Sequence, residues 1–167
     1  MSIDEQRQKV REFFNFCCGY GGVSETDVGA LLTLDHFHPR SKGGSDSLDN
    51  LVYCCHACNE FKGNYWQPEL ERRILHPKQD VMTVNLFTEE NGRLIALTPT
   101  GEFHLKRLRL NREALIAYRQ KQERIAQDNA GRKALLEAVS QLEERVETLK
   151  ALVTILVPKP ENNDPPH

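Results

Sequence analysis

The stretch over residues 31–66 constrains the fold more than any other part of the chain, because chain breakers and polar residues there alternate with short apolar runs. Residues 31–34 are apolar and include a β-branched threonine, which favours a strand. Pro39 and two following glycines predict a loop. Residues 51–53 form a second short apolar run, and residues 58–65 have helical spacing. The predicted order is therefore strand, loop, strand, helix.

Polar residues stand at the joints of this unit. Asp35 and His36 follow the first predicted strand, Asn50 precedes the second, and Asn59 lies in the predicted helix. A neutral imidazole can accept a proton from water, and carboxylate and amide oxygens are ligands for hard divalent ions. Adjacent side chains in a regular strand point to opposite faces. If Asp35 and His36 act on one phosphate, the chain should leave regular strand geometry there.

The same residues resemble the motif of the HNH endonuclease family over residues 34–63, and the quoted elements are Asp35-His36, Asn50-Leu51 and Cys58-Asn59-x-x-Lys62-Gly63. The resemblance implies a small ββα-metal nuclease fold. It also implies phosphodiester hydrolysis that depends on Mg²⁺ or Mn²⁺ and leaves 5′-phosphate and 3′-hydroxyl ends. DNA is the expected substrate, and RNA is not excluded.

The resemblance assigns a role to each matching residue. It implies that Asp35 and Asn59 hold the metal ion and that His36 is the general base. Asn50 would orient the loop and the histidine through its amide. Basic side chains beside the motif are predicted to contact substrate phosphates, and they are Arg40, Lys42 and Lys62.

Five cysteines raise the question of a second metal. Many HNH proteins carry a zinc knuckle made of two Cys-x-x-Cys pairs. Here Cys55 and Cys58 form one intact pair, but after Cys18 a glycine stands where the partner cysteine would be. One hypothesis is structural Zn²⁺ on these three cysteines and a fourth group, either Cys17 or His56. The other is that the thiols are packed as small apolar side chains.

Composition limits how the protein could bind nucleic acid and in which compartment we expect it. The net charge is −2, so nucleic-acid binding would rely on local basic clusters. No run of eighteen apolar residues predicts a membrane helix, and the polar N-terminus does not resemble a signal peptide. An odd number of cysteines, two of them in Cys-x-x-Cys spacing, favours a reducing compartment over a disulfide framework. We therefore expect a cytoplasmic protein without a membrane segment.

Weaker patterns flank the motif. Residues 4–16 have one apolar stripe at helical spacing, and residues 24–29 are polar and predicted to form a loop. Asn91-Gly92 is a typical hairpin turn between two short strands. Residues 112–127 are predicted to be a helix that ends or is interrupted at residues 128–131.

A heptad repeat occupies the C-terminal part of the chain. Leucine recurs every seven residues between Leu135 and Leu156, and valines interleave at positions 139, 146 and 153. Valine at a and leucine at d is typical of a parallel two-stranded coiled coil. We therefore expect a homodimer through residues 135–156. A partner protein's helix, or packing of the stripe on the chain's own nuclease domain, are the alternatives.

The sequence as a whole predicts an α+β protein with a small ββα-metal core, flanking helices and a C-terminal coiled-coil helix. The expected boundaries are an HNH nuclease domain over residues 1–119, a helical association segment over 120–157 and a disordered tail over 158–167. Two other functions stay open at this point. One is a nuclease effector subunit that is active only with a sensor or guide protein, and the other is a nucleic-acid-binding module without catalysis.

Overall fold

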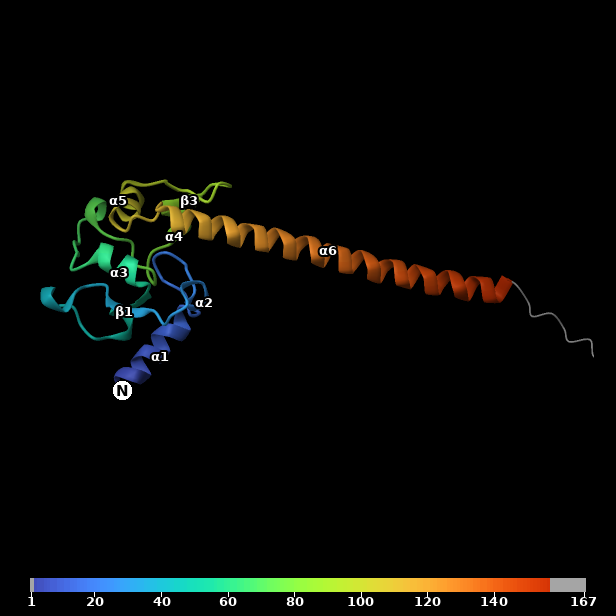
Figure 1. Ribbon diagram of the computed structural model, residues 1–167, viewed down its shortest axis with the longest axis horizontal. Helices are drawn as coiled ribbons and strands as arrows, with labels where there is room; N and C mark the ends of the chain where they lie inside the picture. The colour runs from blue at the N-terminus through green and yellow to red at the C-terminus, as the bar shows by residue number, and fades with distance from the viewer. Residues whose placement is uncertain (1, 157–167) are drawn as a thin grey trace, which may run out of the picture. The chain divides into compact units, whose positions relative to one another are not determined.

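The computed structural model describes residues 2–156, and the chain divides into two compact units, residues 1–121 and 122–167. The described part combines helices with two small antiparallel sheets, which confirms the predicted α+β class (Figure 1). The helices are α1 (Ile3–Phe13), α2 (Glu25–Val28), α3 (His56–Lys62), α4 (Met82–Asn85), α5 (Pro99–Arg107) and α6 (Glu113–Leu156). The strands are β1 (Thr33–His36), β2 (Leu51–Cys54), β3 (Leu86–Thr88) and β4 (Leu94–Ala96).

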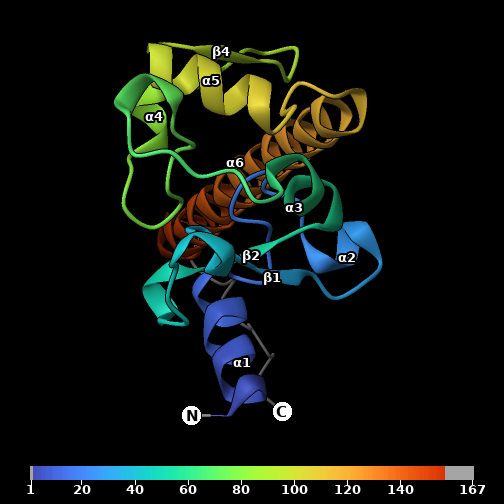
Figure 2. The same cartoon turned by 90° about the vertical axis from the view of Figure 1, so that its left-hand side faces the viewer.

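The β1–β2 hairpin and α3 reproduce the predicted strand, loop, strand, helix order. All four residues of β2 are buried, because α1 packs against β2 while α3 packs against β1 (Figure 2). The antiparallel ladder pairs Asp35 with Val52 and His36 with Leu51. The predicted departure from strand geometry at Asp35 and His36 is therefore wrong. Their side chains have different hydrogen-bond partners, but both residues line one pocket at the end of β1, so regular strand geometry does not keep them apart.

Helix α1 begins at a complete capping box. The Ser2 hydroxyl accepts from the Glu5 amide, and the Glu5 carboxylate accepts from the Ser2 amide. These bonds satisfy amides that an isolated helix start leaves without partners. Val10 on the inner face of α1 is buried, so the helix is held both by its cap and by the core.

Two further local predictions are wrong. Residues 24–29 contain α2, which Ser24 caps and Gly29 ends in the left-handed conformation with φ of 72°. Helix α6 continues through residues 128–131, where we expected an end. One exposed glycine costs a helix only about 1 kcal/mol, and many neighbouring residues in a long helix offset that cost.

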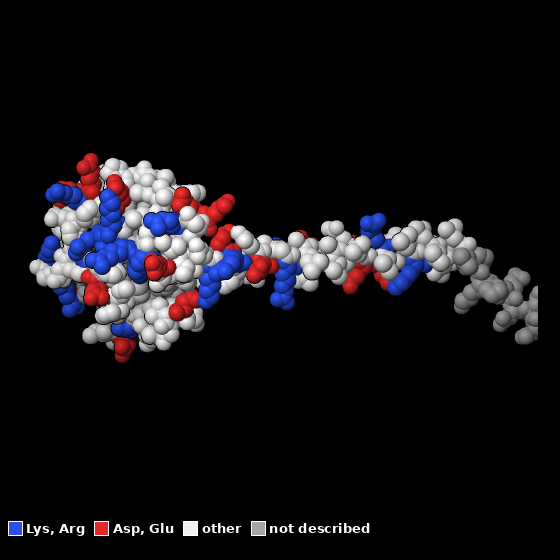
Figure 3. Space-filling view, turned by 45° about the horizontal axis from the view of Figure 1, so that its top comes forward, with Lys and Arg blue, Asp and Glu red and all other residues white. Residues whose placement is uncertain are grey.

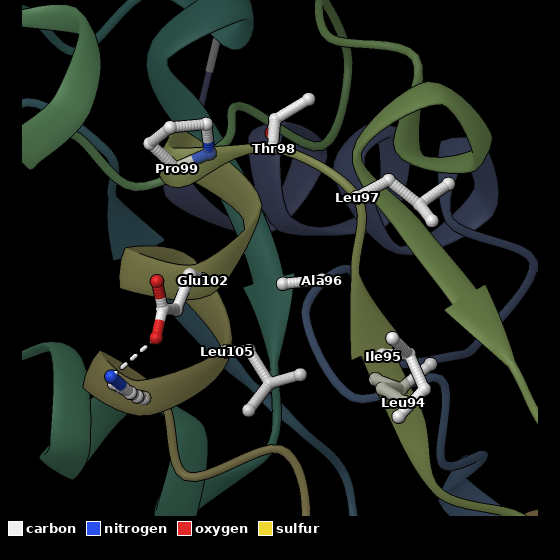
Figure 4. Close-up of a pocket in the computed structure, with 9 residues that line it drawn as sticks. Leu94, Ile95, Ala96, Leu97, Thr98, Pro99, Glu102 and Leu105 are labelled. Atoms are coloured by element: carbon white, nitrogen blue, oxygen red, sulfur yellow. Dashed lines mark hydrogen bonds and ion pairs between the residues drawn. The ribbon is translucent and has the colours of Figure 1, made fainter.

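A second hairpin, β3–β4, packs with α5 in the first unit. It turns at Gly92, as the Asn-Gly pair predicts. A mostly apolar pocket lies between β4 and α5, and residues such as Leu94, Leu97 and Leu105 line it (Figure 4). Thr98 caps α5 by accepting from the Gly101 amide.

The described part of the second unit is the rest of α6, and its side chains are exposed apart from the half-buried Gln122. No helix within residues 2–156 has the length and apolar character needed to cross a bilayer. The expected tail over residues 158–167 lies outside the described residues.

His104 should make the first unit sensitive to acid. Its ring is 1 % exposed, its Nδ1 accepts from the Leu75 amide, and burial lowers its pKa to about 4. The unfolded chain protonates this ring below pH 6.5 and the folded chain only near pH 4, so stability is complete above pH 6.5 and is lost as the pH falls through that window. The loss should approach about 3 kcal/mol.

Urea unfolding at pH 7 and pH 4.5, followed through the fluorescence of Trp66, measures this loss. His104→Gln should flatten the pH dependence. His56→Gln, which replaces an exposed histidine, should not change it. If the free energy of unfolding changed equally with pH in wild type and in His104→Gln, His104 would not be the source of the acid sensitivity.

Candidate active site and cysteine cluster

Asp35 points into the protein from β1. The Tyr20 hydroxyl donates to Asp35 Oδ2 at 2.9 Å, and the Lys62 ammonium donates to Asp35 Oδ1 at 3.0 Å. Burial raises the pKa of Asp35, and the nearby Lys62 charge and the Tyr20 hydrogen bond oppose that rise. The carboxylate therefore needs a cation beside it, and Lys62 provides one.

Lys62 is fully buried at the end of α3. Its ammonium also donates to the His36 carbonyl oxygen at 2.8 Å. A side chain with these partners is not free to reach a substrate phosphate, so the structure does not support the contact that the sequence predicted for Lys62. Its position instead links α3 to β1 and fixes Asp35.

His36 extends to the other side of β1. Its Nε2 lies 2.8 Å from Asp46 Oδ1, and the Arg40 guanidinium donates to the same oxygen. Hydrogen bonds from Arg40 and His36 lower the pKa of Asp46, which keeps it ionised. A carboxylate that accepts from Nε2 selects the tautomer in which Nδ1 is the acceptor. Asp46 therefore orients the His36 ring with Nδ1 as its acceptor nitrogen.

Asn50 fastens the loop between the two strands. Its Oδ1 accepts from the His38 amide at 2.8 Å, while its Nδ2 donates to the carbonyl oxygens of His38 and Ser45 at 2.9 and 2.7 Å. The loop also folds tightly on itself, since a Cβ at Gly44 would lie 1.7 Å from the His38 carbonyl oxygen. This geometry suits the orienting role predicted for Asn50.

Asn59 lies on α3 and faces the same side of β1 as Asp35. Its Nδ2 donates to Thr33 Oγ1 at 3.4 Å, and Thr33 precedes Asp35 by two residues. The structure thus brings Asn59 close to the Asp35 side of the hairpin without direct contact. A carboxylate and an amide oxygen are the kinds of donor that Mg²⁺ takes from proteins, and both oxygens of this carboxylate already accept hydrogen bonds, from Tyr20 and Lys62.

A pocket of about 260 Å³ opens where β1 ends, and its lining includes Asp35, His36 and Arg40. Asn59 is not part of this lining. Lys42 lies on the same loop as Arg40 and is exposed, with its ammonium 3.4 Å from the Trp66 carbonyl oxygen. Two of the three predicted phosphate contacts therefore stand at the surface beside the pocket.

The predicted zinc ligands Cys18, Cys55 and Cys58 do come together. All three are buried, and their sulfur atoms lie within 4.8 Å of one another. Hydrogen bonds from the Cys18 and Cys58 thiols lower the pKa of Cys55, which favours the thiolate that metals bind. Three sulfurs at this spacing could hold one soft metal ion.

The fourth position of the cluster is taken by a glycine. A Cβ on Gly21 would lie 3.2 Å from Cys58 Sγ. Neither proposed substitute replaces it, because the Cys17 thiol donates to the Asn15 carbonyl oxygen and His56 is exposed. The Arg112 guanidinium instead donates to Cys58 Sγ at 3.3 Å and lies 3.8 Å from Cys55 Sγ.

Three partners were missed by reasoning from the sequence, namely Tyr20, Asp46 and Arg112. Tyr20 stands inside the incomplete Cys-x-x-Cys segment, which could have indicated a place near the core. Asp46 follows the loop glycines and carries no spacing signal. Arg112 is fifty-four residues from Cys58, and no local pattern connects them.

Lys62→Met should strongly destabilise the first unit. The substitution leaves Asp35 buried without its cation, and removal of one partner from a buried pair costs about 3–5 kcal/mol. Chemical unfolding at neutral pH measures the loss, which should shrink at low pH as Asp35 becomes protonated. Lys106→Met removes an exposed pair with Glu102 and should cost below about 1 kcal/mol. Equal costs for the two variants would contradict this account of Asp35.

Gly21→Cys should convert the three-cysteine cluster into a four-cysteine zinc site. Elemental analysis and competition against a chelator should show zinc binding at least about tenfold tighter than in wild type. Loss of a residue that only supports a metal ligand already changes affinity by about tenfold, and a direct ligand should matter at least as much. Gly131→Cys adds a cysteine at an open position in α6 and is the control. Unchanged affinity in Gly21→Cys would show that Gly21 is not at a ligand position.

Comparison with known proteins agrees with this geometry. Residues 18–75 match the family model described as HNH endonuclease, a segment that holds the hairpin, α3 and all three clustered cysteines. No curated protein and no solved structure matched the chain. The chain therefore carries a domain of the HNH endonuclease family over residues 18–75.

Proposed function

We propose that the protein is a metal-dependent endonuclease that hydrolyses phosphodiester bonds in DNA. The observation that carries the proposal is the His36–Asp46 pair beside a pocket that Asp35 and Arg40 also line. An oriented imidazole, a carboxylate and a guanidinium supply a base, a metal ligand and a phosphate contact.

His36 is the general base in this proposal. Asp46 accepts from Nε2, so Nδ1 can take a proton from the attacking water. The Lys62 ammonium holds the His36 carbonyl oxygen, and Asn50 holds the loop that follows. These contacts fix the ring before substrate arrives, which lowers the cost of orientation in the reaction.

Asp35 and Asn59 would hold Mg²⁺ or Mn²⁺. Such an ion supplies positive charge at the phosphate and at the leaving oxygen. Asp35 suits this role because Lys62 and Tyr20 fix its carboxylate in one orientation and because it lines the pocket. Asp35 and Asn59 come from facing elements, β1 and α3, so the hairpin and the helix together would set the spacing between the donors.

Arg40 and Lys42 are the remaining candidates for phosphate contacts. Both are exposed on the turn that follows Pro39. Figure 3 shows basic side chains gathered in one area of the visible face, with acidic side chains around them. Local basic side chains of this kind suit a chain with net charge −2, and phosphate binding through Arg40 and Lys42 would weaken as salt is added.

Substitution of His36 or of its partner Asp46 tests the proposal in a plasmid-cleavage assay with Mg²⁺, Mn²⁺ or EDTA. His36→Ala should lower the cleavage rate by about 10²- to 10⁴-fold. Asp46→Asn should lower it less, and EDTA should abolish cleavage in all proteins. Asp49→Asn changes an exposed acid of the same loop and should cleave as wild type does.

Circular dichroism of each variant separates loss of the base from loss of folding. Cleavage by folded His36→Ala at the wild-type rate would exclude His36 as the base. If wild type cleaved RNA but not DNA, the substrate would be RNA, and the proposed hydrolysis of phosphodiester bonds would stand.

A further inference from the structure

The second unit presents a continuous apolar stripe. The stripe follows the heptad repeat of α6, with valines at a and leucines at d. Its members are Leu135, Val139, Leu142, Val146, Leu149, Val153 and Leu156. Their exposed fractions run from 44 % at Val139 to 76 % at Leu156. Seven apolar side chains in one line on a helix need a partner surface, because exposed contiguous apolar area favours association.

We propose that the stripe pairs with the same stripe of a second copy, and that the two helices run antiparallel. This pairing does not depend on the proposed nuclease chemistry. The heptad pattern alone favours the parallel arrangement, but the charges beside the stripe decide the orientation. In a coiled coil the e and g positions flank the apolar seam and select partner and direction.

The flanking charges oppose a parallel pair. Arg145 occupies a g position and Lys150 occupies the following e position. In a parallel dimer, g of one helix faces the following e of the other, so Arg145 would stand opposite Lys150 twice. Two like-charge contacts in a seam of three heptads would weaken that dimer.

The antiparallel arrangement replaces these contacts with attraction. There e faces e, and a two-fold axis near Val146 places Glu143 of each helix opposite Lys150 of the other. Valine at a then meets leucine at d in each layer of the seam, so large and small side chains alternate across it. Both ion pairs form, and the layers from Val139 to Leu156 are filled, while Leu135 lies beyond the paired layers.

Contacts within the helix do not prevent this pairing. Lys150 lies 2.7 Å from Glu147, which occupies a b position outside the seam. Lys133 and Glu137 form a similar pair at b and f positions, 4.0 Å apart. Charge reversal at Lys133 therefore removes a contact within α6 and leaves the seam alone, which makes it the matched control.

Charge reversal at Lys150 distinguishes the two orientations in the full-length protein. Lys150→Glu should raise the dimer Kd by about tenfold, since two attractive pairs become repulsive. In a parallel dimer the same change would pair Glu with Arg145 and lower the Kd. Glu143→Lys combined with Lys150→Glu should restore the wild-type Kd, and Lys133→Glu should leave it unchanged. Sedimentation equilibrium measures all four proteins.

A distance measurement checks the orientation independently. With labels placed at Ala134 through an encoded non-cysteine residue, the antiparallel dimer should give a separation of roughly 30–40 Å, from the 1.5 Å rise per residue. A parallel dimer should give roughly 10–15 Å, close to the spacing of two packed helices. Three results would each overturn the proposal. They are a tighter dimer with Lys150→Glu, the short label distance, and a folded protein that is monomeric both at about 100 μM and after about 100-fold dilution.

Discussion

The buried ion pair between Asp35 and Lys62 is the interaction on which the site depends. It joins β1 to the last turn of α3, and the same ammonium holds the His36 carbonyl oxygen. Because a buried carboxylate is stable only beside a cation or as the neutral acid, the sequence needs a lysine at this place even before any metal or substrate arrives. Tyr20 adds a third segment of the chain to the same carboxylate. One charge thus positions the proposed metal ligand and the backbone of the proposed base together.

The cysteine cluster holds three sulfur atoms close together beside a glycine at the position where the family resemblance would place a fourth cysteine. Cys18, Cys55 and Cys58 remain buried and close, although Gly21 stands where a further side chain would reach Cys58. Arg112 brings a positive charge to the sulfurs from the segment just before α6. The guanidinium can offset the charge of thiolates whether or not an ion binds among them, so it supports the packing of the first unit in either case.

The hairpin and α3 were predictable because short apolar runs and chain breakers determine local structure over a few residues. The meeting of the three cysteines followed from the same unit once the family resemblance was taken into account. Side-chain partners were not predictable in the same way. The sequence suggested that Lys62 is a surface cation. However, it follows Asn59 by three residues on α3, so both lie on the helix face toward β1, and Lys62 pairs with Asp35. The break expected at residues 128–131 also failed, because helix continuity is a sum over many residues and one glycine is too weak to end it.

The loop between β1 and β2 carries a final consequence for variation in this protein. Asn50 ties it to the backbone at His38 and Ser45, and Gly44 leaves no room for a side chain against the His38 carbonyl. The span that holds Arg40 and Asp46 therefore has a fixed length. If the turn Arg40–Lys42 contacts substrate as proposed, exchange of its side chains should alter substrate preference, whereas an inserted residue would move Asp46 away from the imidazole that it orients.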